Sequence, residues 1–156
     1  MTISSPICHK PELEPEGMPE IERLIPQRAP VLLVDRLLRA SAEEGETCYT
    51  VAADGFFIDD EGCLAETGLL EHIAQSASAL AGWRALQDGA LHPPLGFIGE
   101  VKKFRCYARP AAGSVLHTVV RLTAEADGVW LMEGETRSGQ TVLASTRLKV
   151  AVRSND

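Results

Sequence analysis

Hydrophobic positions along this chain concentrate in one long segment, residues 65–88. At 3.6 residues per turn, this segment predicts a helix of about six turns. Its apolar side chains point in nearly every direction around the axis, which is typical of a helix surrounded by other elements. We therefore expect a buried central helix whose apolar residues include Leu69, Leu70, Ile73, Ala74, Ala77, Leu80, Ala81 and Trp83.

Strands are predicted on both sides of this helix. Residues 31–38 are a continuous apolar run of strand length, and residues 47–53 alternate after a turn at Gly45. A short helix is predicted at residues 19–24, because a proline opens this segment and another proline follows it. About four more strands are expected after the helix, in segments 95–110, 114–126, 129–137 and 141–153.

This order of elements predicts a single α+β domain over residues 19–153. An antiparallel sheet of about six strands is expected to wrap around the long helix. The Asp-Gly pair at residues 127–128 is a strong hairpin signal between two of these strands. Residues 1–18 are rich in proline and glutamate, and they are predicted to form a flexible tail.

Composition and charge narrow the class of protein. The chain has 156 residues, of which 45% are hydrophobic and 24% are charged, as in a soluble globular domain. No apolar run approaches a membrane span, and the N-terminus lacks the features of a signal peptide, so a cytoplasmic location is expected. The formal net charge of -7 argues against general nucleic-acid binding.

The cysteines do not form a motif. They are scattered along the chain, with no Cys-x-x-Cys pair and no histidine at zinc-ligand spacing. We therefore expect reduced thiols, no metal site and no cofactor. The four residues are Cys8, Cys48, Cys63 and Cys106.

A polar stripe interrupts the apolar surface of the predicted helix. Glu71, Gln75 and Ser78 follow one another at steps of four and three, so they lie on one face. Burying a carboxyl group is costly unless it is paired or protonated, and such groups concentrate at functional sites. Glu71 is therefore the first catalytic candidate. Alternatively, the stripe faces solvent, or Glu71 pairs with an arginine such as Arg28.

The loop before the helix is a second candidate region. Backbone N–H groups and the helix dipole converge at a helix N-terminus, and Gly68 would permit close approach by a ligand. The same loop contains Phe56 and Phe57, which by default fold onto the core.

The segment after the helix carries a basic stripe. Strand alternation places Lys103, Arg105, Tyr107 and Arg109 on one face, and Lys102, Phe104, Cys106 and Ala108 on the other. On an acidic protein, this stripe indicates a docking surface for a partner. The alternative is a solvated face that only improves solubility.

Three segments, taken in order, resemble the hotdog-fold dehydratases that act on 3-hydroxyacyl chains carried by acyl carrier protein. They are LIPQRAPVLLVDRLL, LLEHIAQSASALAGW and GFIGEVKKFRCYARPAAGS, and together they span residues 24–114. The resemblance implies a helix enclosed by a sheet, no cofactor and an edge-to-edge dimer. It also implies that acyl carrier protein is the partner and that Lys103, Arg105 and Arg109 dock it.

By position, Glu71 matches the family carboxyl that assists departure of the 3-hydroxyl group, and Gln75 matches the glutamine beside it. The chain departs from the family in the preceding loop, where FFIDDEG replaces a segment that contains a catalytic histidine. Gln27 likewise replaces the histidine of the opening motif, and Asp60 is nearest by position to the missing loop histidine. In these departures the chain is similar to the branch associated with aryl-polyene pigment pathways.

Three functions remain open from the sequence. The first is dehydration, which requires a base that the loop no longer supplies; the candidates are His72, His92, Asp60 or Glu71 acting alone. The second is thioester hydrolysis by a single helix carboxylate. The third is a non-catalytic acyl-binding subunit that pairs with an active paralogue. In each case we expect the substrate to contact Gln27, Phe57, Asp60, Gly68, His72 and Gln75.

Overall fold

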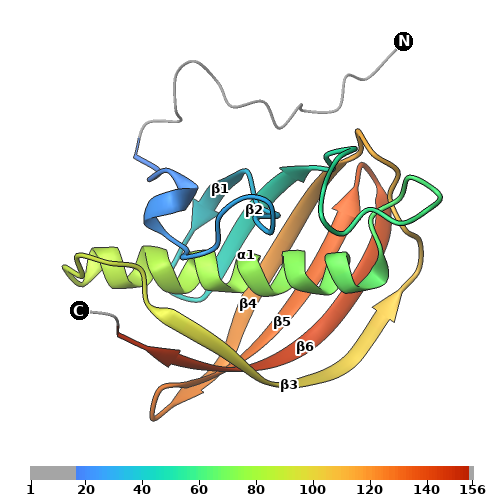
Figure 1. Cartoon of the computed structure of the whole chain (residues 1–156). Coiled ribbons are helices and arrows are strands. Elements are labelled where there is room, and N and C mark those ends of the chain that lie inside the picture. Colours follow the sequence, from blue (N-terminus) through green and yellow to red (C-terminus); the bar gives the residue numbers. More distant parts are fainter. Residues whose placement is uncertain (1–16, 155–156) are drawn as a thin grey trace.

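The computed structural model describes residues 17–154 of the chain. One long helix lies along the inner side of a strongly curved sheet, and a short 3-10 helix sits beside it (Figure 1). In chain order the elements are η1 (Ile21–Arg23), β1 (Arg36–Ala40), β2 (Glu44–Thr50), α1 (Glu66–Gln87), β3 (Leu95–Cys106), β4 (Val115–Ala126), β5 (Val129–Ser138) and β6 (Thr141–Arg153).

The six strands form one sheet in the order β1-β2-β4-β5-β6-β3. All neighbouring strands are antiparallel. The predicted α+β architecture, with a sheet of about six strands around a central helix, is confirmed. Strand β3 follows the helix but pairs with β6, so it forms one edge of the curved sheet (Figure 1). Among residues 17–154, no other strand pairs with β3.

Two glycines allow α1 to lie this deep in the sheet. A Cβ atom added to Gly134 on β5 would come within 2.4 Å of Cγ2 of Ile73. A Cβ atom added to Gly82 on the helix would come within 2.0 Å of the carbonyl oxygen of Leu24. Any larger residue at either position would push the helix away from its neighbours.

The segment that leads into β1 differs from the prediction. A strand was expected over residues 31–38, but β1 begins only at Arg36. In the preceding residues, Val31 and Leu33 form hydrogen bonds with side chains of α1 rather than with a neighbouring strand. An apolar run of strand length does not reveal this difference, because both arrangements bury the same side chains.

The alternation of β3 is interrupted by a bulge. Its register against β6 shifts between Lys102 and Arg105, and Lys103 within the bulge has a φ of 52°. The partners of Lys102 and Arg105 on β6 are two residues apart, so both side chains lie on the outer face of the sheet. The prediction that Lys102 faces the opposite side is therefore wrong.

Two further expectations concern the cysteines and the N-terminal segment. Cys63 and Cys106 are free thiols, but Cys48 is disulfide-bonded. The expectation of reduced thiols is wrong for Cys48, because pairing depends on which cysteines meet in space and not on their spacing. Most of the predicted tail at residues 1–18 lies outside the described residues.

Candidate active site

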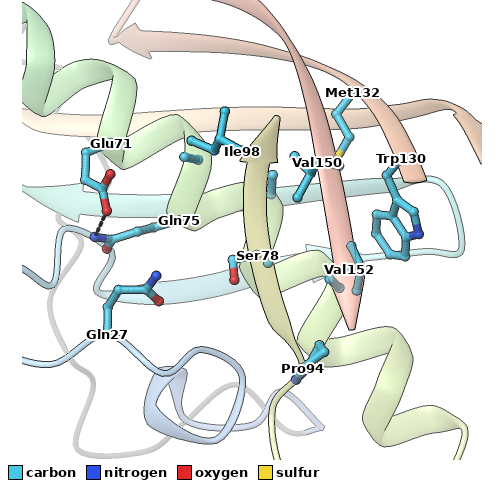
Figure 2. Close-up of a pocket in the computed structure, with 14 residues that line it drawn as sticks. Gln27, Glu71, Gln75, Ser78, Pro94, Ile98, Trp130, Met132, Val150 and Val152 are labelled. Atoms are coloured by element: carbon cyan, nitrogen blue, oxygen red, sulfur yellow. Dashed lines mark hydrogen bonds between the residues drawn. The ribbon is translucent and has the colours of Figure 1, made fainter. Parts of the chain in front are cut away.

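A cavity of about 130 Å³ lies between one face of α1 and strands β3, β5 and β6. Its helix side carries polar groups from Glu71, Gln75 and Ser78, together with Gln27 from the loop after η1 (Figure 2). Its sheet side is apolar and includes Trp130 and Val150, among others. The cavity therefore has one polar wall and one apolar wall, and we refer to it as the tunnel.

The lining runs along the helix from Glu71 to Ala81. Ten residues of helix at a rise of 1.5 Å span about 15 Å. The lining is mainly apolar along this length, with the carboxyl group of Glu71 at one end.

Glu71 is half-buried at the polar wall. The side-chain amide of Gln75 donates a hydrogen bond to Oε1 of Glu71 at 2.9 Å (Figure 2). Arg28 does not pair with Glu71, because its guanidinium donates to the backbone carbonyls of Glu22, Ile25 and Gln27. The carboxylate thus lines the tunnel without a cationic partner among its lining residues.

Gln75 is 1% exposed and uses its whole amide within the protein. Its oxygen accepts from the backbone N–H of Leu33 at 2.7 Å, and its nitrogen donates to the carbonyl of Val31 at 2.8 Å and to Glu71 at 2.9 Å. An amide nitrogen has only two N–H donors. Gln75 therefore positions Glu71 and anchors residues 31–33, and it retains no donor for a substrate.

His72 is fully buried and does not line the tunnel. Its Nδ1 lies 2.7 Å from the carbonyl oxygen of Leu33, which can only accept, so Nδ1 carries the proton. Its Nε2 lies 2.6 Å from Oγ1 of Thr118, and this hydroxyl lies 2.7 Å from that of Thr136. Burial lowers the pKa of His72 to about 4. The structure therefore gives His72 a place in the core, away from the position expected for a base.

Other candidates near the two ends of α1 also lie away from the tunnel. An added Cβ atom at Gly68 would fall 2.6 Å from Cδ1 of Leu64 and 2.8 Å from Cβ of Phe57. Gly68 is thus required for packing of the loop on the helix, and the expected approach of a ligand there is not supported. Asp60 and His92 are exposed, and neither lines the tunnel.

Arg109 pairs with two acidic side chains that are distant from it in the sequence. Its guanidinium forms ion pairs with Asp59 and with Glu61. The backbone N–H of Cys63, followed by that of Glu61 and the charge of Arg109, holds the pKa of Asp59 below its usual value. Arg109 therefore fastens the loop before α1 through these ion pairs, and its role in docking stays a prediction.

Lys103 and Arg105 keep the exposed position that was predicted. With Tyr107 they line a groove of about 640 Å³ on the outer face of the sheet. Arginines elsewhere in this groove lie near glutamates, at 3.7 Å for Arg121 and Glu44. Among residues 17–154, no ion pair involves Lys103 or Arg105.

The sheet wall of the tunnel was missed by sequence reasoning. Trp130 and Met132 on β5, with Val150 and Val152 on β6, contribute its apolar surface (Figure 2). Each pair is spaced by two residues, so the alternation shows that its members share a face. It does not show that a cavity separates this face from the helix.

Two classes of feature are not found among residues 17–154. No group of three or more His, Cys, Asp or Glu side chains is arranged to hold a metal ion. In the same part of the chain, no helix is both long and apolar enough to span a membrane.

Most of the chain matches one known protein family. It is the ApeP-like family, described as ApeP dehydratase, and the match covers residues 19–156. No curated protein matches the chain in sequence.

A chain of the dehydratase heterocomplex ApeI:P from Xenorhabdus doucetiae is similar in structure, with a TM-score of 0.79, 25% identity and coverage of 88% of this chain and 92% of that one. The E. coli PaaI protein of the phenylacetic acid degradation operon has a TM-score of 0.61, 11% identity and coverage of 74% and 80%. A hypothetical thioesterase from Streptococcus pneumoniae, solved with coenzyme A, has a TM-score of 0.61, 8% identity and coverage of 76% and 85%. At these low identities, the last two share the fold alone.

Proposed function

Because the chain belongs to the ApeP-like dehydratase family, we propose that it takes part in dehydrating a 3-hydroxyacyl thioester carried on acyl carrier protein. The product is the trans-2-enoyl thioester. The observation that carries this proposal is the carboxyl group of Glu71, which is half-buried in the polar wall of an otherwise largely apolar tunnel and oriented by Gln75.

Dehydration requires two proton transfers. A base removes a proton from the α-carbon, the Cα–Cβ double bond forms, and the bond from the β-carbon to the 3-hydroxyl oxygen breaks. The departing oxygen takes a proton from an acid and leaves as water. Glu71 is suited to be this acid, since an acyl chain extended along the apolar wall would hold its first carbons beside the carboxyl group.

The base is proposed to come from a second chain. Within residues 17–154, Glu71 is the one ionisable side chain in the lining. The edge strand β3 exposes Phe97, Ile98 and Val101, and Ile98 also lines the tunnel. A paralogue that paired with this edge would therefore lie next to the tunnel. The similar ApeI:P structure is a heterocomplex, which favours a different chain over a second copy.

Mass spectrometry of a 3-hydroxyacyl carrier protein tests this proposal. The carrier would be incubated with the chain alone and with the chain co-expressed with its paralogue. Loss of water that requires both chains is the expected result. Binding without any change of mass in either sample would leave only an acyl-binding role.

A second function, thioester hydrolysis, is favoured by one observation. A lone carboxylate in the lining can activate water without a histidine. The same experiment distinguishes this function, because hydrolysis removes the whole acyl group from the carrier while dehydration retains it.

Docking of the carrier is proposed at Lys103 and Arg105. Replacing both residues with glutamate is expected to weaken turnover of carrier-linked substrate roughly tenfold, because charge reversal opposes an acidic partner. Turnover of a short pantetheine thioester should stay within about twofold, since it lacks the carrier's surface. Steady-state kinetics on both substrates provides the measurement.

Lys149→Glu supplies a matched control, because Lys149 is exposed on the same outer face but lies outside the groove lined by Lys103 and Arg105. An equal loss with both substrates would contradict docking at this surface.

A further inference from the structure

The polar wall of the tunnel contains hydrogen-bonding groups that the proposed dehydration does not use. Of its four polar residues, Glu71 has its catalytic assignment, and the amide of Gln75 is fully satisfied within the protein. Gln27 and Ser78 remain. Both line the cavity, and both point toward its interior (Figure 2).

Gln27 has a buried acceptor without a partner. Its side-chain oxygen is shielded from solvent and accepts no hydrogen bond in the described part of the chain. A buried acceptor left unpaired is unfavourable, and such groups are uncommon in native proteins. Pro94, which lines the same cavity, has no N–H to offer it. Gln27 therefore brings an unpaired acceptor to the lining of the cavity, where the described residues offer it no donor.

The backbone holds Gln27 in this position. Arg28 donates hydrogen bonds to the carbonyl oxygens of Ile25 at 2.7 Å, Gln27 at 2.8 Å and Glu22 at 2.9 Å. Leu24 and Ile25, just before it, are fully buried. Because the loop is fastened on both sides of Gln27, the amide is directed inward without any hydrogen bond of its own side chain.

Ser78 adds a hydroxyl group to the same stretch of the tunnel. It lies one helical turn beyond Gln75 and is half-buried. The nearby Ser76 differs, since its hydroxyl lies 2.7 Å from Oγ1 of Thr47 and donates to the carbonyl of His72 at 2.8 Å. No such bond occupies the hydroxyl of Ser78 among residues 17–154. Gln27 and Ser78 together form what we name the polar subsite.

The chemistry of the polar subsite restricts its ligand. An amide oxygen requires an O–H or N–H donor, and a serine hydroxyl can complete the pair by donating or accepting. Among residues 17–154, no Lys or Arg side chain lines this cavity. An anionic group such as a phosphate would thus find no cationic partner there, so the ligand group is neutral.

We infer that the polar subsite of Gln27 and Ser78 binds a neutral hydrogen-bond donor of the thioester ligand, one turn or more along the tunnel from Glu71. The inference rests on the proposed function, since it assumes a thioester in the tunnel. Two parts of such a ligand carry this chemistry. One is a hydroxyl group on the acyl chain, and the other is an amide N–H of the pantetheine arm.

Ligand binding in the Glu71→Gln background tests the inference without turnover. Isothermal titration would compare octanoyl pantetheine with octanoyl pantetheines that carry a hydroxyl at C3, C5 or C7. It would also compare octanoyl pantetheine with the octanoyl thioester of a plain alkyl thiol of equal length. The comparison in which the protein prefers the donor-bearing ligand identifies which part of the thioester supplies the hydrogen-bond donor.

In one of the two comparisons, we expect the donor-bearing ligand to bind roughly three- to tenfold more tightly, as for one neutral hydrogen bond. Gln27→Leu should reduce this preference to less than about twofold, and Ser78→Ala should weaken it in part. Gln27→Met serves as a second variant of similar length should Gln27→Leu lower thermal stability. The inference is overturned if the preference persists in the Gln27 variants, or if neither comparison shows a preference.

These outcomes are independent of those for dehydration. Water loss without a Gln27-dependent preference would leave the proposed function intact and remove the polar subsite. A Gln27-dependent preference without water loss would keep the polar subsite in an acyl-binding protein.

Discussion

Replacing Glu71 with glutamine is expected to lower dehydration by roughly 100- to 10,000-fold, the usual range for loss of a general acid. The substitution is nearly isosteric. An amide oxygen at this position can still accept the hydrogen bond that Gln75 donates to Oε1 of Glu71, so the tunnel wall should keep its shape. The variant removes the transferable proton and little else. Product formation under saturating substrate, measured with the partner chain present, gives the rate.

Glu66→Gln is the matched control, since Glu66 is an exposed carboxylate in the first turn of the same helix. It should retain full turnover. Both variants should bind a non-reactive acyl thioester with unchanged affinity and unfold at unchanged temperature. Turnover of Glu71→Gln at the rate of the unmodified protein would remove Glu71 from the reaction.

The second large effect is a dependence of the free energy of unfolding on pH, and it arises from His72. In the folded protein burial lowers its pKa to about 4, whereas an unfolded histidine has a pKa of about 6.5. Between these values the unfolded chain binds more protons than the folded chain, so the free energy of unfolding falls as pH decreases from about 6.5 to about 4. The contribution of His72 is about 1.4 kcal/mol per pH unit, or about 3 kcal/mol across the window. This contribution of His72 to stability is fully present above about pH 6.5.

Carboxyl groups also titrate in part of this range, so the measurement is a difference between variants. His72→Gln should lose roughly 2–5 kcal/mol at pH 7, because the Leu33 carbonyl and the Thr118 hydroxyl lose their buried partner. Urea unfolding at several pH values should then show a slope smaller by about one proton than that of the unmodified protein. His92→Gln, on an exposed loop, controls for loss of a histidine. Equal slopes in the His72 variant and the unmodified protein would contradict a buried neutral imidazole.

Local patterns predicted most elements closely. The helix expected over residues 65–88 is observed as Glu66–Gln87, and the last strand matches its predicted segment, Thr141–Arg153. The Asp127 and Gly128 turn has positive φ at both residues, as an Asp-Gly hairpin requires. These features could be predicted because helix and strand periods, and the φ preferences of turn residues, depend on neighbours along the chain.

Polar residues on α1 were harder to interpret. The steps of four and three placed Glu71, Gln75 and Ser78 on one face, and the structure brings all of them to the tunnel. His72 follows Glu71 directly, yet it is buried between segments about 40 residues away on either side. Helical geometry separates the two side chains by about 100°, but it does not say which of them meets a cavity.

The basic stripe was also only partly predictable from the sequence. Lys103, Arg105 and Arg109 form a regular stripe in the sequence, but Arg109 is paired with Asp59 and Glu61, about 50 residues earlier. The bulge at Lys103 also moves Lys102 to the outer face. Alternation along a strand predicts neither a distant ion pair nor an inserted residue.

By itself, the sequence determined the helix-in-sheet architecture, the family resemblance and the polar stripe that contains Glu71, because each follows from periodicity or from residues close together in the chain. Only the tertiary structure decided that Gln75 is satisfied, that His72 is in the core, that Arg109 is paired and that Gln27 places an unpaired oxygen in the lining of the tunnel. Those outcomes depend on which groups from distant segments come within hydrogen-bonding distance, and packing of the whole domain sets those distances.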